Sequence, residues 1–137
     1  MLLIDNMSNL NTTYDMACIK PNLTYDFYIP SMNLMIELDG EQHFSQISNW
    51  NTPESTQEKD SEKIKYCINN GYSIIHIYQP EVWKNTYDWK EALKSAIFDL
   101  SLESEPKVVF ISCCDKYSNH IKQLDNTVKY EILNPTY

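Results

Sequence analysis

The segment spanning residues 25–44 constrains the fold more than any other part of the chain. It reads YDFYIPSMNLMIELDGEQHF, with two alternating apolar runs on either side of the turn-forming letters PSMN. This pattern predicts a β-hairpin whose loop is Ser31-Met32. The resulting register places Asp26 directly opposite Glu37. Asp39 falls on the same face as Glu37, because strand side chains alternate with a period of two.

Carboxylates gathered on one face of a hairpin favour a metal site. Like charges directly opposite each other in an antiparallel pair are destabilising, and a divalent cation such as Mg²⁺ neutralises them. Asp26, Glu37 and Asp39 are therefore the candidate metal ligands. The spacing alone is also compatible with a solvated acidic face. The other face is predicted to anchor the hairpin through apolar side chains, which are Tyr25, Phe27, Ile29, Leu34, Ile36 and Leu38.

Three motifs follow one another along the chain: DFYIP at 26–30, IELDGEQHF at 36–44 and DSEK at 60–63. Together they resemble the PD-(D/E)xK nuclease superfamily. The likeness is greatest to the very-short-patch-repair-like endonuclease domains of bacteria, phages and large DNA viruses. It covers residues 18–78 and implies an α/β fold, a restriction-endonuclease-like mixed β-sheet flanked by helices.

The resemblance implies a metal-dependent endonuclease or nickase that hydrolyses phosphodiester bonds in DNA. Mg²⁺ or Mn²⁺ would be held by Asp26, Glu37 and Asp39 and would activate water for attack on phosphorus. Asp39 stands where the superfamily name expects a lysine, a variation that the resembled subfamily shares. An RNA endonuclease would use the same residues.

Further catalytic candidates follow the carboxylates. His43 suits a general base or a water-orienting role near neutral pH, and it would otherwise cap the loop that ends the strand. Gln42 is expected to orient water or backbone. Lys63 would supply the positive charge that Asp39 does not, stabilising charge on the phosphate. Otherwise Lys63 forms an exposed ion pair with Asp60.

The chain of 137 residues is predicted to be a single domain. Residues 1–17 are expected to be a loosely held arm, and 79–137 a C-terminal extension of the motif core. The resembled nucleases precede the hairpin with a helix that bears a glutamate, and no such helix is evident here. A homodimer or a partner chain that supplies the missing helix is therefore an open expectation.

Periodicity and turn residues predict the remaining elements. Residues 45–55 are expected to be a surface loop pinned by Trp50. His76 is placed on the less buried face of its strand, and Trp83 and the helix after it are expected to cover the sheet. The predicted elements are a helix at 56–70 capped by Ser55 or Thr56 and ended by Gly71, a central strand at 72–78, a helix at 88–100, a strand at 107–112, a helix at 116–124 and a strand at 128–133.

The net charge of −8 opposes binding to a polyanion, and every basic residue is a lysine. Nucleic-acid contact therefore requires a local lysine patch, backbone N–H groups or a partner chain. The best candidate patch is Lys116, Lys122 and Lys129, with Tyr117 and His120 interleaved, although a solvated helix face explains them equally well. The acidic surface favours one alternative function, a catalytically inert nuclease-fold module that binds a protein or mimics nucleic acid.

The four cysteines show neither a C-x-x-C pair nor a zinc-ligand spacing with the histidines, which indicates reduced thiols. Cys113 and Cys114 are expected to be small buried apolar residues at a strand end. No apolar run reaches the length of about 18 residues needed to span a bilayer, and the first residues do not resemble a signal peptide. An intracellular protein is expected, cytoplasmic or, if viral, in the host nucleus, and neither membrane-bound nor secreted.

Overall fold

The computed structural model describes residues 17–20, 23–46 and 52–135. Its centre is a five-stranded sheet in the order β3-β4-β5-β6-β7. β3 and β4 are antiparallel, and each later neighbour pairs in parallel. The predicted α/β class with a mixed sheet is confirmed. The strands are β3 (Phe27–Ile29), β4 (Leu34–Asp39), β5 (Ser73–Tyr78), β6 (Val108–Ile111) and β7 (Tyr130–Leu133).

The hairpin forms in the predicted register. Phe27 pairs with Ile36 and Ile29 with Leu34, so continuing the ladder by one position brings Asp26 opposite Glu37. The connection is the 3₁₀ turn η2 (Pro30–Met32) followed by Asn33, whose φ is 50°. Asn is one of the few residues that adopt this left-handed conformation readily. The turn is therefore wider than the two-residue loop that the sequence predicts.

The helix α2 (Pro53–Asn69) begins three residues earlier than predicted, so the surface loop before it is shorter than 45–55. Thr52 is its N-cap, because the Thr52 hydroxyl accepts a hydrogen bond from the Ser55 N–H at 3.1 Å. A proline is well tolerated at the first helical position. Gly71 has a φ of 83° just past the helix end, as expected. Trp50 lies outside the described residues.

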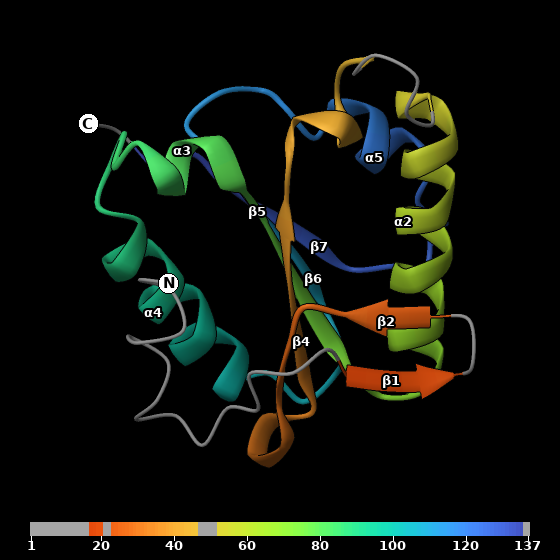
Figure 1. Ribbon diagram of the computed structural model, residues 1–137. Helices are drawn as coiled ribbons and strands as arrows, with labels where there is room; N and C mark the ends of the chain where they lie inside the picture. The colour runs from red at the N-terminus through yellow and green to blue at the C-terminus, as the bar shows by residue number, and fades with distance from the viewer. Residues whose placement is uncertain (1–16, 21–22, 47–51, 136–137) are drawn as a thin grey trace.

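Helices cover both faces of the sheet (Figure 1). α2 and α5 (Ser118–Lys122) lie on one side. α3 (Gln79–Trp83) and α4 (Trp89–Ser101) lie on the other. The central strand and the α4 helix agree with the sequence prediction. Trp83 does not cover the sheet as expected, because it ends the short α3 and is 75% exposed.

The two faces have separate apolar cores. The core on the α4 side contains Phe27, Ile29, Leu34 and Ile36 from the hairpin. Tyr25 packs instead on the α2 side with Ile64 and Cys67, contrary to the prediction. The reason is that β2 (Leu23–Tyr25) leaves the main sheet and pairs with β1 (Ala17–Lys20) in a separate two-stranded sheet.

Several smaller expectations are settled by the described residues. Cys113 is half-buried and Cys114 exposed, contrary to prediction, because β6 ends at Ile111 and both cysteines follow the strand. Residues 1–16 of the expected N-terminal arm lie outside the described residues, as does any helix there. Within 17–20, 23–46 and 52–135, no helix combines the length and apolar character needed to cross a membrane.

Candidate metal centre

The carboxylate face of the hairpin is buried. Glu37 and Asp39 end β4 and are 4% and 0% exposed. In the parallel ladder, Glu37 pairs with His76 of β5. α2 packs over this end of the face and brings Asp60 and Lys63 to it, as the hydrogen bonds described below demonstrate. A solvated acidic face is thereby excluded for Glu37 and Asp39.

Glu37 is held by two donors. Its Oε1 accepts the Asp26 backbone N–H at 3.0 Å, and its Oε2 accepts the Lys63 ammonium at 3.1 Å. The Asp26 carboxylate accepts the Leu38 N–H at 2.8 Å. Lys63 thus pairs with Glu37 and not with Asp60, so the expected exposed ion pair within α2 is wrong.

Burial makes both Asp26 and Glu37 hold their protons more tightly than isolated carboxylic acids do. Burial, reinforced by the neighbouring Asp26 charge and opposed by Lys63, raises the pKa of Glu37 to about 7. Burial also raises the pKa of Asp26, although the Leu38 N–H counteracts it. Near neutral pH Glu37 is therefore divided between its two protonation states.

Asp39 has one satisfied and one unsatisfied oxygen. Its Oδ2 contacts His76 Nδ1 at 2.7 Å and accepts the Tyr117 hydroxyl at 2.8 Å. Its Oδ1 is buried and has no hydrogen-bond partner among the described residues. His43 Nδ1 lies 3.8 Å from this oxygen. An unsatisfied buried acceptor is costly, which makes Asp39 Oδ1 a candidate ligand atom for a cation.

His76 is completely buried, contrary to its predicted place on a less buried face. Side chains alternate between the two faces of a strand, and this alternation places His76 on the α2 side. In the ladder His76 pairs with Glu37 of β4 and Phe110 of β6. Burial alone would lower the pKa of His76, but the Asp39 charge outweighs it and raises the pKa to about 9. The raised pKa favours a protonated His76 in contact with Asp39 at neutral pH.

Asp60 joins two histidines. Its Oδ2 lies 2.6 Å from His43 Nδ1 and 2.9 Å from His120 Nε2. Burial opposes ionisation of Asp60, yet the hydrogen bonds to His120 and His43 hold its pKa well below the usual range. In return, although burial alone would lower the pKa of His43, the Asp60 hydrogen bond raises it. His43 is also anchored through its backbone, because Gln57 Nε2 donates to its carbonyl at 2.7 Å.

Gln42 lies beside these groups on the 3₁₀ turn η3 (Glu41–His43) and is half-buried. A Cβ at Gly40 would collide with the Gln42 amide. Gly40 thus leaves room for the present Gln42 side-chain conformation, which is flexible and could move away from a larger residue. The Gly40 φ of −79° suits any residue, so the backbone conformation does not require glycine here.

The chemistry of the donor set fits a hard divalent cation. Glu37, Asp39 and Asp60 each offer one carboxylate oxygen, and these oxygens lie within 4.8 Å of one another. Asp26 is not part of that set. Its backbone N–H donates to Glu37 and its carboxylate accepts the Leu38 N–H, so both groups are hydrogen-bonded to β4. A second set, His43, Asp60 and His120, shares Asp60 and offers imidazole nitrogen. All-oxygen donors suit Mg²⁺ and Mn²⁺ better than softer ions.

Of the predicted lysine patch, Lys122 and Lys129 are exposed, whereas the interleaved Tyr117 and His120 are not part of the surface. Lys116 lies over the Tyr78 ring, 5.0 Å from its centroid. Lys129 forms an ion pair with Glu105. Tyr117 and His120 are buried because both turn inward toward the carboxylates.

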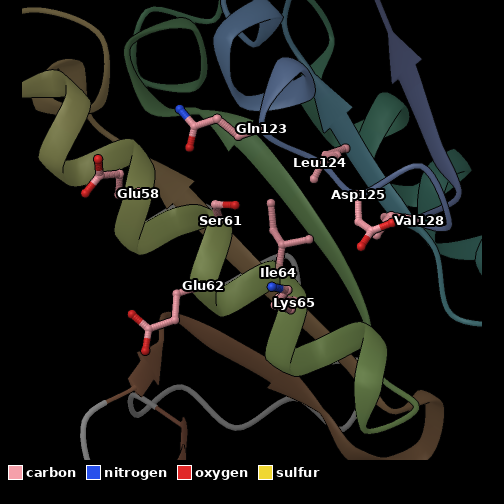
Figure 2. A pocket seen from close by; sticks show the side chains of 9 residues that line it. All are labelled: Glu58, Ser61, Glu62, Ile64, Lys65, Gln123, Leu124, Asp125 and Val128. Atoms are coloured by element: carbon pink, nitrogen blue, oxygen red, sulfur yellow. The ribbon is translucent and has the colours of Figure 1, made fainter.

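A surface pocket of about 430 Å³ lies elsewhere, between α2 and the segment after α5 (Figure 2). Its walls carry acidic groups, among them Glu58, Glu62 and Asp125, with Lys65 as a basic one. None of the carboxylates or histidines of the candidate metal centre lines it. The predicted site residues therefore meet in a buried cluster apart from this pocket.

Four members of the cluster were not predicted as catalytic or metal-binding residues: Asp60, His76, Tyr117 and His120. Asp60 lies four residues before the buried Ile64, a spacing that places both on one helix face and was a usable signal. His76 meets Glu37 through the parallel register of β4 and β5, which local sequence does not determine. Tyr117 and His120 come from a distant short helix, and local sequence carries no signal for their contacts.

Comparisons with known proteins add one relative. An uncharacterized protein of Haemophilus influenzae (strain ATCC 51907 / DSM 11121 / KW20 / Rd) is 34% identical over 76 residues, which is 56% of this chain. The matched part is 42% of the relative's length, so this chain spans less than half of that protein. No protein-family model matches the chain. No solved structure matches it either.

Proposed function

We propose that the protein is a metal-dependent endonuclease or nickase that hydrolyses phosphodiester bonds in DNA, built on a restriction-endonuclease-like sheet. One observation carries the proposal. Three buried carboxylates from β4 and α2 converge within 4.8 Å, and one of their oxygens, Asp39 Oδ1, has no hydrogen-bond partner among the described residues. Buried acids are expensive, and such groups concentrate at functional sites.

Glu37, Asp39 and Asp60 would hold Mg²⁺ or Mn²⁺, and Asp26 would fix Glu37 through its backbone N–H. When bound, the cation would supply Lewis-acid stabilisation of phosphate charge and a more acidic water. Asp60 takes the place of Asp26 in this proposed ligand set. The raised pKa of Glu37 implies that cation binding displaces a proton and strengthens with rising pH.

Lys63 and His43 are the parts of the cluster that reach solvent. Their side chains are 15% and 14% exposed, whereas Asp39 has no exposed surface. A substrate phosphate would therefore meet the Lys63 ammonium first, and Lys63 would stabilise charge that develops on it. Because His43 Nδ1 is engaged by Asp60, its Nε2 is the atom available to accept or return a proton.

One observation favours the rival function, a catalytically inert interaction module. The carboxylates already have partners within the chain: Lys63 for Glu37, His76 for Asp39, and His43 with His120 for Asp60. Such pairing could hold the cluster without a metal ion. The absence of arginine and the net charge of −8 also weaken binding to DNA.

The deciding experiment is cleavage of supercoiled plasmid, single-stranded DNA and RNA with Mn²⁺, comparing the wild type with Glu37→Gln and Lys63→Met. Each variant is expected to lose at least about a hundredfold in rate, the cost of removing a preorganised electrostatic group. Glu62→Gln is the matched control, since Glu62 is an exposed acid on the same helix. Cleavage that survives Glu37→Gln, or no cleavage of any polymer, would overturn the proposal. Cleavage confined to RNA would overturn DNA as the substrate.

A further inference from the structure

A second cluster of ligand atoms lies at the junction of α3 and the end of β6. Glu81 is buried, while Cys113 is half-buried and Cys114 exposed. The Cys113 and Cys114 sulfur atoms lie 3.0 and 3.4 Å from Glu81 Oε2. One oxygen and two sulfurs are thus within 4.8 Å of one another. None of these residues contributes to the candidate metal centre.

We propose that Glu81, Cys113 and Cys114 bind a thiophilic divalent cation, Zn²⁺ above all, at a site independent of the candidate metal centre. Zinc binds cysteine sulfur at about 2.3 Å and carboxylate oxygen at about 2.1 Å, which places sulfur and oxygen about 3.6 Å apart in a tetrahedron. The observed separations of 3.0 and 3.4 Å are shorter than this by about 0.6 and about 0.2 Å. Small side-chain rotations therefore suffice to admit the ion.

The ligands are already oriented by their neighbours. Glu81 Oε1 accepts the Cys113 N–H at 3.1 Å, and Ser112 Oγ donates to Oε2 at 3.3 Å. The Cys114 N–H donates in turn to Ser112 Oγ at 3.2 Å. Hydrogen bonds of this kind hold metal ligands in place and raise affinity. The exposed Cys114 leaves the site open to solvent, through which an ion can arrive.

An independent observation also indicates a missing ligand. Tyr87 is 4% exposed, and its buried hydroxyl has no hydrogen-bond partner among the described residues. After burial, the groups that raise the pKa of Tyr87 are Glu81, Cys113 and Cys114, so the hydroxyl lies within electrostatic reach of all three. Three protein ligands leave the fourth tetrahedral position of zinc to water. Such a zinc-bound water would provide the hydrogen-bond partner that the Tyr87 hydroxyl lacks among the described residues.

The cation would join two parts of the chain that are distant in sequence, the start of α3 and the segment after β6. Burial and the Glu81 carboxylate raise the pKa of Cys113 to about 11, so the metal-free cysteine is a thiol. The site would act as a structural clip at the carboxyl edge of the sheet.

The test is zinc binding to the reduced, chelator-treated full chain, measured by competition with a chromophoric chelator, with Co²⁺ as a second probe. We expect one zinc per chain at this site and a thiolate-to-cobalt charge-transfer absorption. Cys114→Ser and Glu81→Gln are each expected to weaken zinc binding about tenfold or more, at least the cost of losing a supporting residue. The double variant Cys113→Ser with Cys114→Ser is expected to lose both signals.

Two controls separate this site from others. Asp115→Asn alters an exposed acid beside Cys114, and Glu37→Gln disables the nuclease centre; both are expected to retain the cobalt–thiolate absorption. Because Cys114 is exposed, its replacement should leave the melting temperature of the metal-free protein unchanged, so a loss of binding is not a loss of folding. Zinc affinity unchanged in the double cysteine variant, or no thiolate absorption with Co²⁺, would overturn the proposal.

Discussion

The two faces of β4 and β5 share a backbone but differ in chemistry. Toward α4 the strands present Leu34, Ile36, Ile75 and Ile77 to an apolar core. Toward α2, the carboxyl end of β4 presents Glu37 and Asp39. A buried ion pair is often no more stable than apolar residues of the same shape. The apolar face is therefore explained by stability, whereas the charged end calls for a functional explanation.

The largest expected effect is the difference in stability lost when each face is mutated. Ile77→Ala should lower the free energy of unfolding by about 2–5 kcal/mol, because it removes fully buried methyl groups and leaves a cavity. Glu37→Gln should cost less, since the amide has the shape of the protonated acid and the pKa of Glu37 is already about 7. Urea unfolding at neutral pH measures both. A larger loss of unfolding free energy for Glu37→Gln than for Ile77→Ala would contradict the view that the apolar face supplies most of the stability.

The second effect is a loss of stability with rising pH in the metal-free protein. His76 has its pKa raised from 6.5 to about 9, so its contribution is complete below pH 6.5 and is lost as pH rises through 9. The shift corresponds to a loss on the order of 3 kcal/mol. Glu37 acts in the same direction, because its pKa is raised from 4.5 to about 7 and its contribution is lost as pH rises through 7.

Unfolding of the wild type and of His76→Gln at about pH 6 and about pH 10 checks this prediction. The variant should lose part of the pH dependence. Equal slopes for both proteins would contradict a charged His76. Asp60 affects stability only at acidic pH. Its pKa in the folded protein is lowered, so its contribution to the free energy of unfolding is present above pH 3.8 and is lost as the pH falls toward that lowered pKa.

The smallest effect concerns the helix that closes the charged face. Thr52→Ala should cost about 1 kcal/mol, because the Thr52 hydroxyl caps α2 and thereby supports the placement of Asp60 and Lys63. Thr56→Ala, at the N-cap position suggested by sequence, should stay within about 0.5 kcal/mol. Thermal melts of the two variants compare them directly. Equal costs would mean that the helix begins later than described.

The comparison also explains what sequence could and could not predict. The hairpin register, the central strand and α4 follow from local alternation and helical periodicity, so their prediction needed no tertiary information. The position of Tyr25 could not be derived in this way, because the chain leaves the main sheet at Asp26 and β2 joins a separate pair. The start of α2 was misplaced because Thr52 and Pro53 were read as part of a loop.

The sequence predicted the proximity of some residues of the candidate site but not of others. Glu37, Asp39, His43 and Lys63 stand in motifs and meet as expected through β4, η3 and α2. Their long-range partners depend on how α5 packs, and α5 contains only one turn or so of helix with no motif of its own. Tertiary packing alone places Tyr117 and His120 on Asp39 and Asp60, so no local pattern announces them.

Calorimetric titration of the metal-free protein with Mn²⁺ tests the central claim most directly, comparing the wild type with Asp39→Asn and the exposed-acid control Glu62→Gln. The account predicts binding by the wild type and the control, with about 2.7 kcal/mol of stabilisation when free Mn²⁺ is a hundred times the Kd. Asp39→Asn should show neither binding nor stabilisation, because Asp39 Oδ1 has no hydrogen-bond partner in the described part of the chain. Equal Mn²⁺ binding by all three proteins, or by none, would contradict the assignment of the charged face as a metal site.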